Sequence, residues 1–182
     1  DPRYTYVSVR HLFVEMPDSN FKPRVADQRV GYFSSKITDL SSYKYVTAVD
    51  VINRWRLEKK DPDAELSEPI KPIVYWVENS TPMEIRPFVV KGIEAWNEAF
   101  EKAGFKNAVV AKVQPDDAEW DAGDVEYNVV RWASTPAAPY SGYGPSIANP
   151  RTGEMIAADI VQEFGAIKSG YRLRKIGGYS ED

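Results

Sequence analysis

Hydrophobic and polar residues follow two different periods along this chain, and each period predicts a different kind of element. Over 4–16 apolar and polar positions alternate, which is typical of a half-buried strand, and Pro17 ends this stretch. A second stretch, 45–57, is rich in Val, Ile, Trp and Thr and also favours a strand. The residues between them, 19–44, are polar and irregular and predict a loop or an extended arm. We therefore expect a β-rich arm at the N-terminus.

The strongest periodic signal is that of a helix over 82–103. Apolar residues recur there at helical spacing and leave a charged opposite face. Thr81, Pro82 and Glu84 have the spacing of a capping box, and Gly104 suits the left-handed residue that closes a helix. We expect the apolar face to pack on a sheet with Trp96 as a central core residue, and that face comprises Ile85, Phe88, Val89, Ile93, Trp96 and Phe100.

Strands are predicted on both sides of this helix. Short apolar runs favour buried strands over 71–78 and 108–113, and a further strand over 125–132 follows an acidic loop. Residues 144–162 are typical of a hairpin, because Gly153 can adopt the positive φ that its turn needs.

The order strand, helix, strand, strand, hairpin defines the predicted fold class. A strand–helix–strand unit implies a right-handed crossover and parallel pairing. We therefore predict a mixed α/β fold whose mainly parallel sheet carries one antiparallel edge strand and one long helix, preceded by the β-rich arm. The charged, proline-containing segment 58–69 separates the two parts. The predicted division is an arm (1–66), an α/β unit (67–164) and an irregular tail (165–182).

Composition and charge exclude several classes of protein. The net charge of −4 and the pI of about 5.2 argue against a nucleic-acid-binding protein. No apolar run approaches the roughly 20 residues that span a bilayer. The sequence starts at Asp1 and shows no targeting segment, so we expect a processed or excised segment. The absence of cysteine excludes disulfides and thiolate chemistry, and it fits a cytosolic and an exported bacterial protein equally. We expect an exported bacterial protein, periplasmic or extracellular, rather than a cytoplasmic one.

A single histidine in 182 residues limits the metal chemistry of this chain. A catalytic zinc takes about three protein ligands, usually His with Asp, Glu or Cys, and one water. His11 alone cannot provide two or three imidazoles, and we interpret it as a hydrogen-bonded packing residue of the first strand. Asp159 is either a buried carboxylate with a role or an outward-facing strand residue. An acidic cluster is interpreted as a solvated loop rather than a calcium site, because its spacing does not fit an EF-hand: Asp116, Asp117, Glu119, Asp121, Asp124 and Glu126.

Several separate motifs together resemble one family. The sequences Gly-Ile-Glu-Ala-Trp-Asn-Glu-Ala-Phe over 92–100 and Asn-Pro-Arg-Thr-Gly-Glu over 149–154 are similar to segments of bacterial zinc-dependent metalloproteases described by domains of unknown function. The wider similarity is to the metzincin peptidases. The chain departs from the pattern at 162–165. The resemblance covers nearly all of residues 4–162, and its other segments are 10–11, 15–18, 23–24, 30–33, 54–62, 67–69, 71–75, 103–105 and 144–146.

This resemblance implies that the chain carries the upper, substrate-binding subdomain of a metzincin-like peptidase. In such enzymes a later helix supplies a His-Glu-x-x-His motif, a third His follows, and the bound zinc activates a water. The motif does not occur in this chain, so the zinc and the catalytic residues would belong to the remainder of the peptidase domain in an intact parent enzyme. We expect no catalytic residue and no metal ligand here, and we expect this chain alone to be inactive.

The resemblance also implies that one edge strand binds the substrate. An extended peptide can add to the free N–H and C=O groups of a sheet edge, and in metzincins the equivalent strand lies above the zinc. Two alternatives stay open: an ordinary edge hairpin guarded by Pro145 and Pro150, and a non-catalytic peptide-binding or structural module with the same fold. The predicted substrate-binding residues are Gly144, Pro145, Ser146, Ile147, Ala148 and Asn149.

Overall fold

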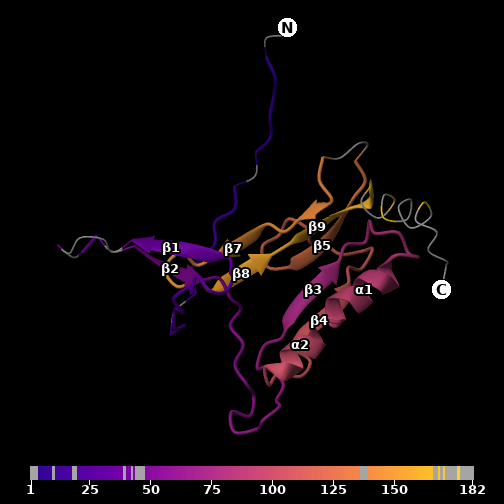
Figure 1. Ribbon diagram of the computed structural model, residues 1–182. Helices are drawn as coiled ribbons and strands as arrows, with labels where there is room; N and C mark the ends of the chain where they lie inside the picture. Colours follow the sequence, from indigo (N-terminus) through magenta and orange to yellow (C-terminus); the bar gives the residue numbers. More distant parts are fainter. Residues whose placement is uncertain are drawn as a thin grey trace.

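A five-stranded mixed sheet with helices on one face forms the centre of the molecule (Figure 1). The structure is a computed structural model that describes residues 4–9, 11–17, 20–38, 40–41, 43, 48–135, 139–165, 168, 170 and 176. The strand order is β4-β3-β5-β9-β6. The predicted fold class, a mainly parallel mixed sheet with an antiparallel edge strand and one long helical segment, is confirmed. Four strands are parallel, β4 (Val109–Val113), β3 (Ile73–Val77), β5 (Asn128–Ala133) and β9 (Ile160–Glu163), and the edge strand β6 (Gly142–Tyr143) is antiparallel to β9.

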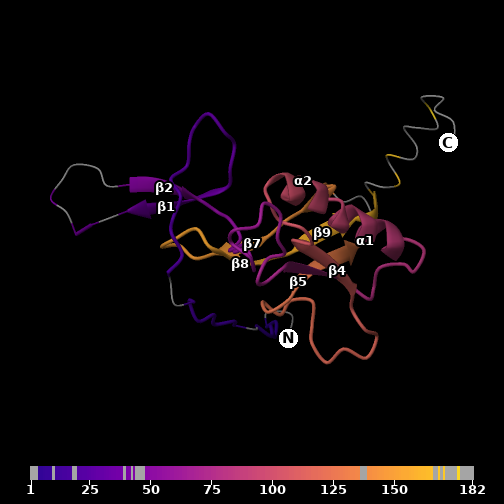
Figure 2. The same cartoon turned by 90° about the horizontal axis from the view of Figure 1, so that it is seen from below.

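Two smaller sheets of two antiparallel strands each lie beside the central one (Figure 2). The first pairs β1 (Ser34–Thr38) with β2 (Ala48–Ile52), and the second pairs β7 (Ser146–Ala148) with β8 (Met155–Ala158). The strand predicted over 45–57 is therefore shorter than expected. The segment predicted as a loop contains β1, whose sequence Ser-Ser-Lys-Ile-Thr has a single large apolar residue and so gave no alternation to detect.

The N-terminal strand prediction is wrong. Residues 4–9 and 11–17 belong to no strand ladder, and their side chains are mostly exposed. Alternation of apolar and polar residues describes a strand that has a neighbour, but it does not supply the neighbour that must accept and donate the backbone hydrogen bonds.

The predicted long helix is present as two nearly continuous stretches, α1 (Arg86–Glu94) and α2 (Asn97–Lys102). The N–H of Phe100 donates to the carbonyl of Trp96 at 3.1 Å, which carries the helical pattern across the joint. The predicted capping box is wrong, because the helix begins at Arg86 and no side chain caps it. Buried Thr81 instead offers its carbonyl to the Arg86 Nε at 2.8 Å, so 81–85 form a turn that leads into the helix. Gly104 has the expected positive φ.

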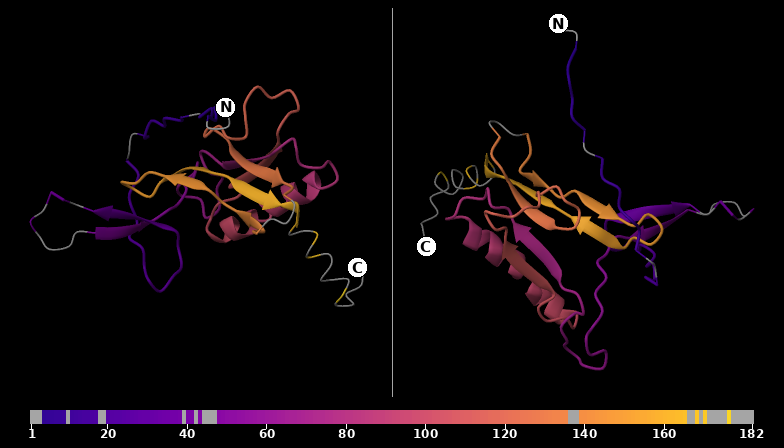
Figure 3. Two further views of the ribbon diagram at one scale, coloured as in Figure 1. Left: turned by 90° about the horizontal axis from the view of Figure 1, so that it is seen from above. Right: turned by 180° about the vertical axis from the view of Figure 1, so that it is seen from behind.

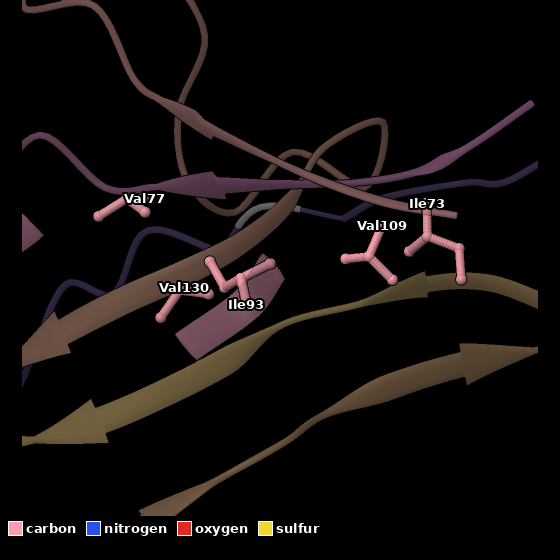
Figure 4. Close-up of a cluster of buried hydrophobic side chains, with 5 residues drawn as sticks. All are labelled: Ile73, Val77, Ile93, Val109 and Val130. Carbon is pink, nitrogen blue, oxygen red and sulfur yellow. The ribbon is translucent and has the colours of Figure 1, made fainter. Parts of the chain in front are cut away.

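The core lies between the helix and the β4–β3–β5 part of the sheet. Its buried side chains come from four elements and lie close together in Figure 4: Ile73, Val77, Ile93, Val109 and Val130. Trp55 and Leu57, from the segment that follows β2, pack against this cluster. The end of the predicted arm therefore contributes to the core of the α/β unit.

The predicted role of Trp96 as a central core residue is wrong. Its side chain is 65 % exposed, and that of Phe88 on the same helix face is 73 % exposed. The reason is that α1 packs mainly against β4 and β3, so in the described part of the chain Phe88 and Trp96 line an apolar groove instead of the core.

No helix among the described residues is long and apolar enough to cross a membrane. The predicted irregular tail, 165–182, falls almost entirely outside the described residues.

Candidate peptide-binding edge

Five of the six predicted substrate-binding residues, 144–148, lie on one edge run, 142–148. Its first part, β6, pairs with β9, and its second part, β7, pairs with β8. A bend at Gly144 and Pro145 separates the two parts. The partner strands β8 and β9 are separated by a matching bend at Asp159, whose N–H donates to the carbonyl of Pro145 at 2.9 Å. Figure 3 shows this run at the edge of the sheet that lies away from α1 and α2.

Backbone geometry fixes which groups of β7 face outward. The carbonyl of Pro145 points inward to Asp159, and the N–H of Asn149 points inward to the carbonyl of Glu154 at 2.8 Å. Because N–H and C=O of one trans peptide point in opposite directions, the N–H of Ser146 and the carbonyl of Ala148 point outward. By the alternation of a strand, both backbone groups of Ser146 and of Ala148 face away from β8, and those of Ile147 face it. Within the described part of the chain, β7 has no strand on its outer side.

Asn149, also predicted to bind substrate, instead holds the turn of the hairpin. It is 2 % exposed, and its carbonyl accepts the N–H groups of Thr152 and Gly153 at 3.1 and 2.8 Å. Its side-chain oxygen accepts the N–H of Arg151 at 2.9 Å. With its backbone and side chain both committed to the turn, Asn149 has a structural role.

Two polar side chains at the bend were not recognised as a pair from the sequence. Asp159 accepts the N–H of Val129 at 2.9 Å, and the side-chain amide of Asn128 accepts the N–H of Ala158 and donates to the carbonyl of Val74, both at 2.9 Å. At the bend between β8 and β9, these side chains therefore bind backbone groups that would otherwise pair with a neighbouring strand. Burial raises the pKa of Asp159, and that of partly buried Tyr75 is raised by burial and then by the negative charge of Asp159. Asp159 is thus a partly buried carboxylate that holds the bend.

An apolar groove of about 920 Å³ opens beside this edge, on the helical side of the sheet. The helix forms one wall through Phe88 and Trp96, and the sheet forms the other through Tyr75 and Ile160. Tyr143 of β6, which is 53 % exposed, also lines the groove. The groove therefore borders β6, the first part of the edge run.

The opposite edge of the sheet, at β4, is blocked at one position. The side-chain amide of Asn97 in α2 accepts the N–H of Val109 at 2.9 Å and donates to its carbonyl at 2.8 Å. The pairing with β3 directs these two groups of Val109 outward, where a further strand would bind them. The β7 edge has no such cap among the described residues.

A second set of contacts fixes the β7–β8 hairpin to the arm. Arg56 forms a bidentate ion pair with buried Glu154, at 2.7 and 3.1 Å, and the pKa of Arg56 is raised chiefly by this hydrogen bond. Arg54 pairs with the hairpin through its backbone, donating to the carbonyl of Gly153 and accepting from the N–H of Met155, both at 2.9 Å. The hairpin is therefore held on its inner side, which leaves its outer side, β7, as the accessible one.

The described residues do not fit a zinc ion. They contain no group of three His, Cys, Asp or Glu side chains close enough to hold a metal. The interpretation of His11 as a packing residue is wrong, because His11 is exposed in the extended N-terminal segment. In the acidic loop, Asp121 and Asp124 accept backbone N–H groups of the loop itself. No chemical step through zinc is therefore assigned to these residues.

Comparison with known proteins gives one match. Residues 2–60 match a domain of unknown function, DUF5117. This match covers the N-terminal arm and stops before the central sheet begins at β3. No curated protein and no solved structure matches the chain.

Proposed function

We propose that this chain is the substrate-binding part of a zinc-dependent, metzincin-like metalloendopeptidase, and that an extended peptide binds along β7. The observation that carries the proposal is the outward orientation of the backbone groups of Ser146 and Ala148 at an uncovered edge beside the apolar groove. An extended peptide satisfies such an edge by strand addition, which makes recognition depend on main-chain groups and tolerant of sequence.

The energetics of this mode suit a protease subsite. Each added main-chain hydrogen bond contributes about 0.5–1.5 kcal/mol net. Two outward-facing residues offer up to four such bonds, so the edge alone gives weak, register-specific binding. Additional affinity would come from apolar side chains of the peptide near Ile147 and Tyr143, which are 40 % and 53 % exposed.

The apolar groove supports a role as part of a larger domain. A helix layer that packs mainly against two of the five strands leaves Phe88, Trp96 and Ile160 facing water, which a finished α/β domain avoids. We propose that the remainder of the peptidase domain covers this groove and supplies the His-Glu-x-x-His helix and the zinc. When bound, that zinc would polarise the scissile carbonyl and activate a water. The residues described above would only bind and orient the peptide.

The proposal is tested on the reading frame beyond Asp182 and on the longer protein that it would encode. We expect its reading frame to encode His-Glu-x-x-His within about one hundred residues, since the motif follows the upper subdomain directly in the resembled family. The longer protein should contain one zinc per chain and hydrolyse an unstructured peptide substrate. Replacing the Glu of the motif by Gln should abolish hydrolysis and leave the zinc content unchanged. A reading frame without the motif would refute the peptidase proposal.

The non-catalytic alternative predicts a different result in the same experiment. A binding module would protect the amides of Ser146 and Ala148 from hydrogen exchange when a peptide is added, but the longer protein would show no zinc-dependent hydrolysis. The present chain without its continuation should bind no stoichiometric zinc under either reading, which elemental analysis after dialysis checks.

A further inference from the structure

The described residues of the N-terminal segment form an extended chain with apolar side chains and no strand partner. In the described residues 11–17, none belongs to a ladder, and Leu12, Phe13 and Met16 are 53 %, 93 % and 42 % exposed. Consecutive large apolar residues in water are unfavourable, because each loses the transfer free energy that burial would give. Such a segment gains by adding to a sheet edge.

The pattern of 11–16 is that of a strand with one apolar face. Leu12, Val14 and Met16 lie on one side of an extended chain, and His11, Phe13 and Glu15 lie on the other. A strand of this kind suits an edge that has apolar side chains beside it. The β6–β7 run is such an edge: Ile147 of β7 is 40 % exposed, and exposed Tyr143 of β6 and Ile160 of β9 line the groove beside it.

The arm is anchored close to that edge. Phe21 is buried, and the Cζ of Arg54 lies over its ring, 4.1 Å from the ring centroid. Asn20 accepts a hydrogen bond from Arg56, and Arg56 also binds Glu154 next to β8. Figure 1 shows the N-terminal segment leaving the molecule near this hairpin.

The connecting residues are long enough to reach β7. Arg54 pairs with the inner side of the hairpin, on the edge of β8 away from β7, so a strand added to β7 would lie three strand spacings from Arg54, about 14 Å. The four residue steps from Met16 to the anchored Asn20 span about 13–14 Å when extended, which just matches this distance. Since the anchor lies at the turn end of the hairpin, Met16 would come to rest near Ala148 and the chain would run parallel to β7.

We propose that residues 11–16 add in parallel to the free edge of β7, as an intramolecular strand that competes with outside peptides. In this arrangement the N–H groups of Ser146 and Ala148 donate to the arm, and Leu12, Val14 and Met16 cover the exposed apolar residues beside the edge. The inhibitory consequence rests on the proposed function, because it requires that substrate uses the same edge. The pairing itself does not require it.

Amide hydrogen exchange at Ser146 and Ala148 tests the pairing, in the chain of 182 residues and in a variant that lacks residues 1–17. An amide exchanges only from the open state, so an arm that is paired nine-tenths of the time slows exchange about tenfold. We expect about tenfold faster exchange in the shortened variant, and restored protection when a synthetic peptide of residues 4–16 is added. Unchanged exchange at both amides after removal of the arm would overturn the inference. Faster exchange only at amides of β1 would also overturn it, because the arm would then pair with β1 and not with β7.

Two single variants provide a matched control, since Leu12 and Phe13 are adjacent and exposed but lie on opposite faces of the segment. Leu12→Asp should speed exchange at Ser146 toward the rate of the shortened variant, and Phe13→Asp should leave it near the wild-type rate. Equal effects of the two substitutions would contradict the proposed orientation.

The two proposals fail separately. If removal of the arm speeds exchange but no peptide substrate protects the edge, the arm pairs with β7 and the proposed function is wrong. If peptide substrates protect the edge equally with and without the arm, the proposed function stands and the arm does not block it.

Discussion

Gly153 packs against the carbonyl oxygen of Ile52 so closely that a Cβ at position 153 would overlap it. Gly153 also has a φ of +74°, where L side chains are strained. This contact joins the turn of the β7–β8 hairpin to the end of β2. The turn residue that makes the hairpin possible is thus also the residue that lets the arm approach it.

Gly153→Ala should therefore be strongly destabilising. The left-handed conformation alone costs about 1–2 kcal/mol for a residue with a Cβ, and the overlap with Ile52 adds to this, so we expect a loss of at least about 2 kcal/mol in urea unfolding. Gly92→Ala is the control. Nothing lies within 4 Å of a Cβ at that position in α1, and a helical Ala should stabilise by about 0.5–1 kcal/mol. A loss below about 0.5 kcal/mol for Gly153→Ala would mean that neither its positive φ nor its contact with Ile52 constrains this position.

Sequence patterns identified the elements that are stabilised locally or by complete burial. The apolar run of β3, the helix after it and the positive φ of Gly104 and Gly153 were all predicted and are present. These features depend on short-range conformational preferences or on a continuous apolar run, both of which the sequence displays directly.

Sequence patterns failed where an element depends on a distant neighbour. The alternation over 4–16 predicted a strand, but no described strand lies beside it. Trp96 fits the apolar face of the helix, but its exposure depends on how many strands the helix covers. In the site, the edge position of Ser146 and Ala148 was predicted from the family resemblance. Which of their backbone groups face outward required the hydrogen bonds of Pro145 and Asn149.

The paired bonds between Asn97 and Val109 should contribute measurably to stability. Val109 is 5 % exposed, so removal of the amide leaves a buried N–H and a buried carbonyl without a partner. Asn97→Ala should cost about 1–3 kcal/mol. Exposed Glu101 in the same helix provides the control, and Glu101→Ala should change stability by less than about 0.5 kcal/mol. If the two variants unfold at the same urea concentration, the amide of Asn97 does not stabilise the β4 edge.

Trp96→Ala should have a small effect in this chain and a large one in a longer protein. The side chain is 65 % exposed, so we expect a loss below about 1 kcal/mol here. If the remainder of the domain covers the groove, the same change in the longer polypeptide should cost about 3–5 kcal/mol, as for a buried large residue. Chemical denaturation of wild type and Trp96→Ala, in this chain and in the longer protein, measures the two losses. Equal small costs in both proteins would show that nothing downstream packs on this wall of the groove.

Glu163 should stabilise the fold at neutral pH, and this contribution should be lost in acid. Its side chain is enclosed, and the N–H of Thr135, at 2.8 Å, lowers the pKa of the carboxyl group. A lowered folded-state pKa adds stability above the ordinary glutamate pKa of about 4.3, and this stability is lost as the pH falls through the lower folded value. Urea melts between about pH 7 and pH 3 should therefore show a steeper acid loss for wild type than for Glu163→Gln. Parallel curves would mean that the carboxylate is not favoured in the folded state.

Proline substitution distinguishes the two sides of β7. The N–H of Ala148 faces outward and that of Ile147 faces β8, so Ala148→Pro removes a group that only a bound peptide can use, whereas Ile147→Pro breaks the hairpin ladder. We expect Ile147→Pro to cost about 1–3 kcal/mol and Ala148→Pro less than about 1 kcal/mol.

In the longer protein without residues 1–17, Ala148→Pro should lower kcat/KM on peptides by at least about 2- to 10-fold, the equivalent of one lost hydrogen bond, with zinc content and melting temperature nearly unchanged. Both substitutions are needed, because Ile147→Pro shows what damage to the fold alone does to turnover. If Ala148→Pro keeps wild-type turnover while Ile147→Pro unfolds the hairpin, β7 is an ordinary edge strand and the substrate binds elsewhere.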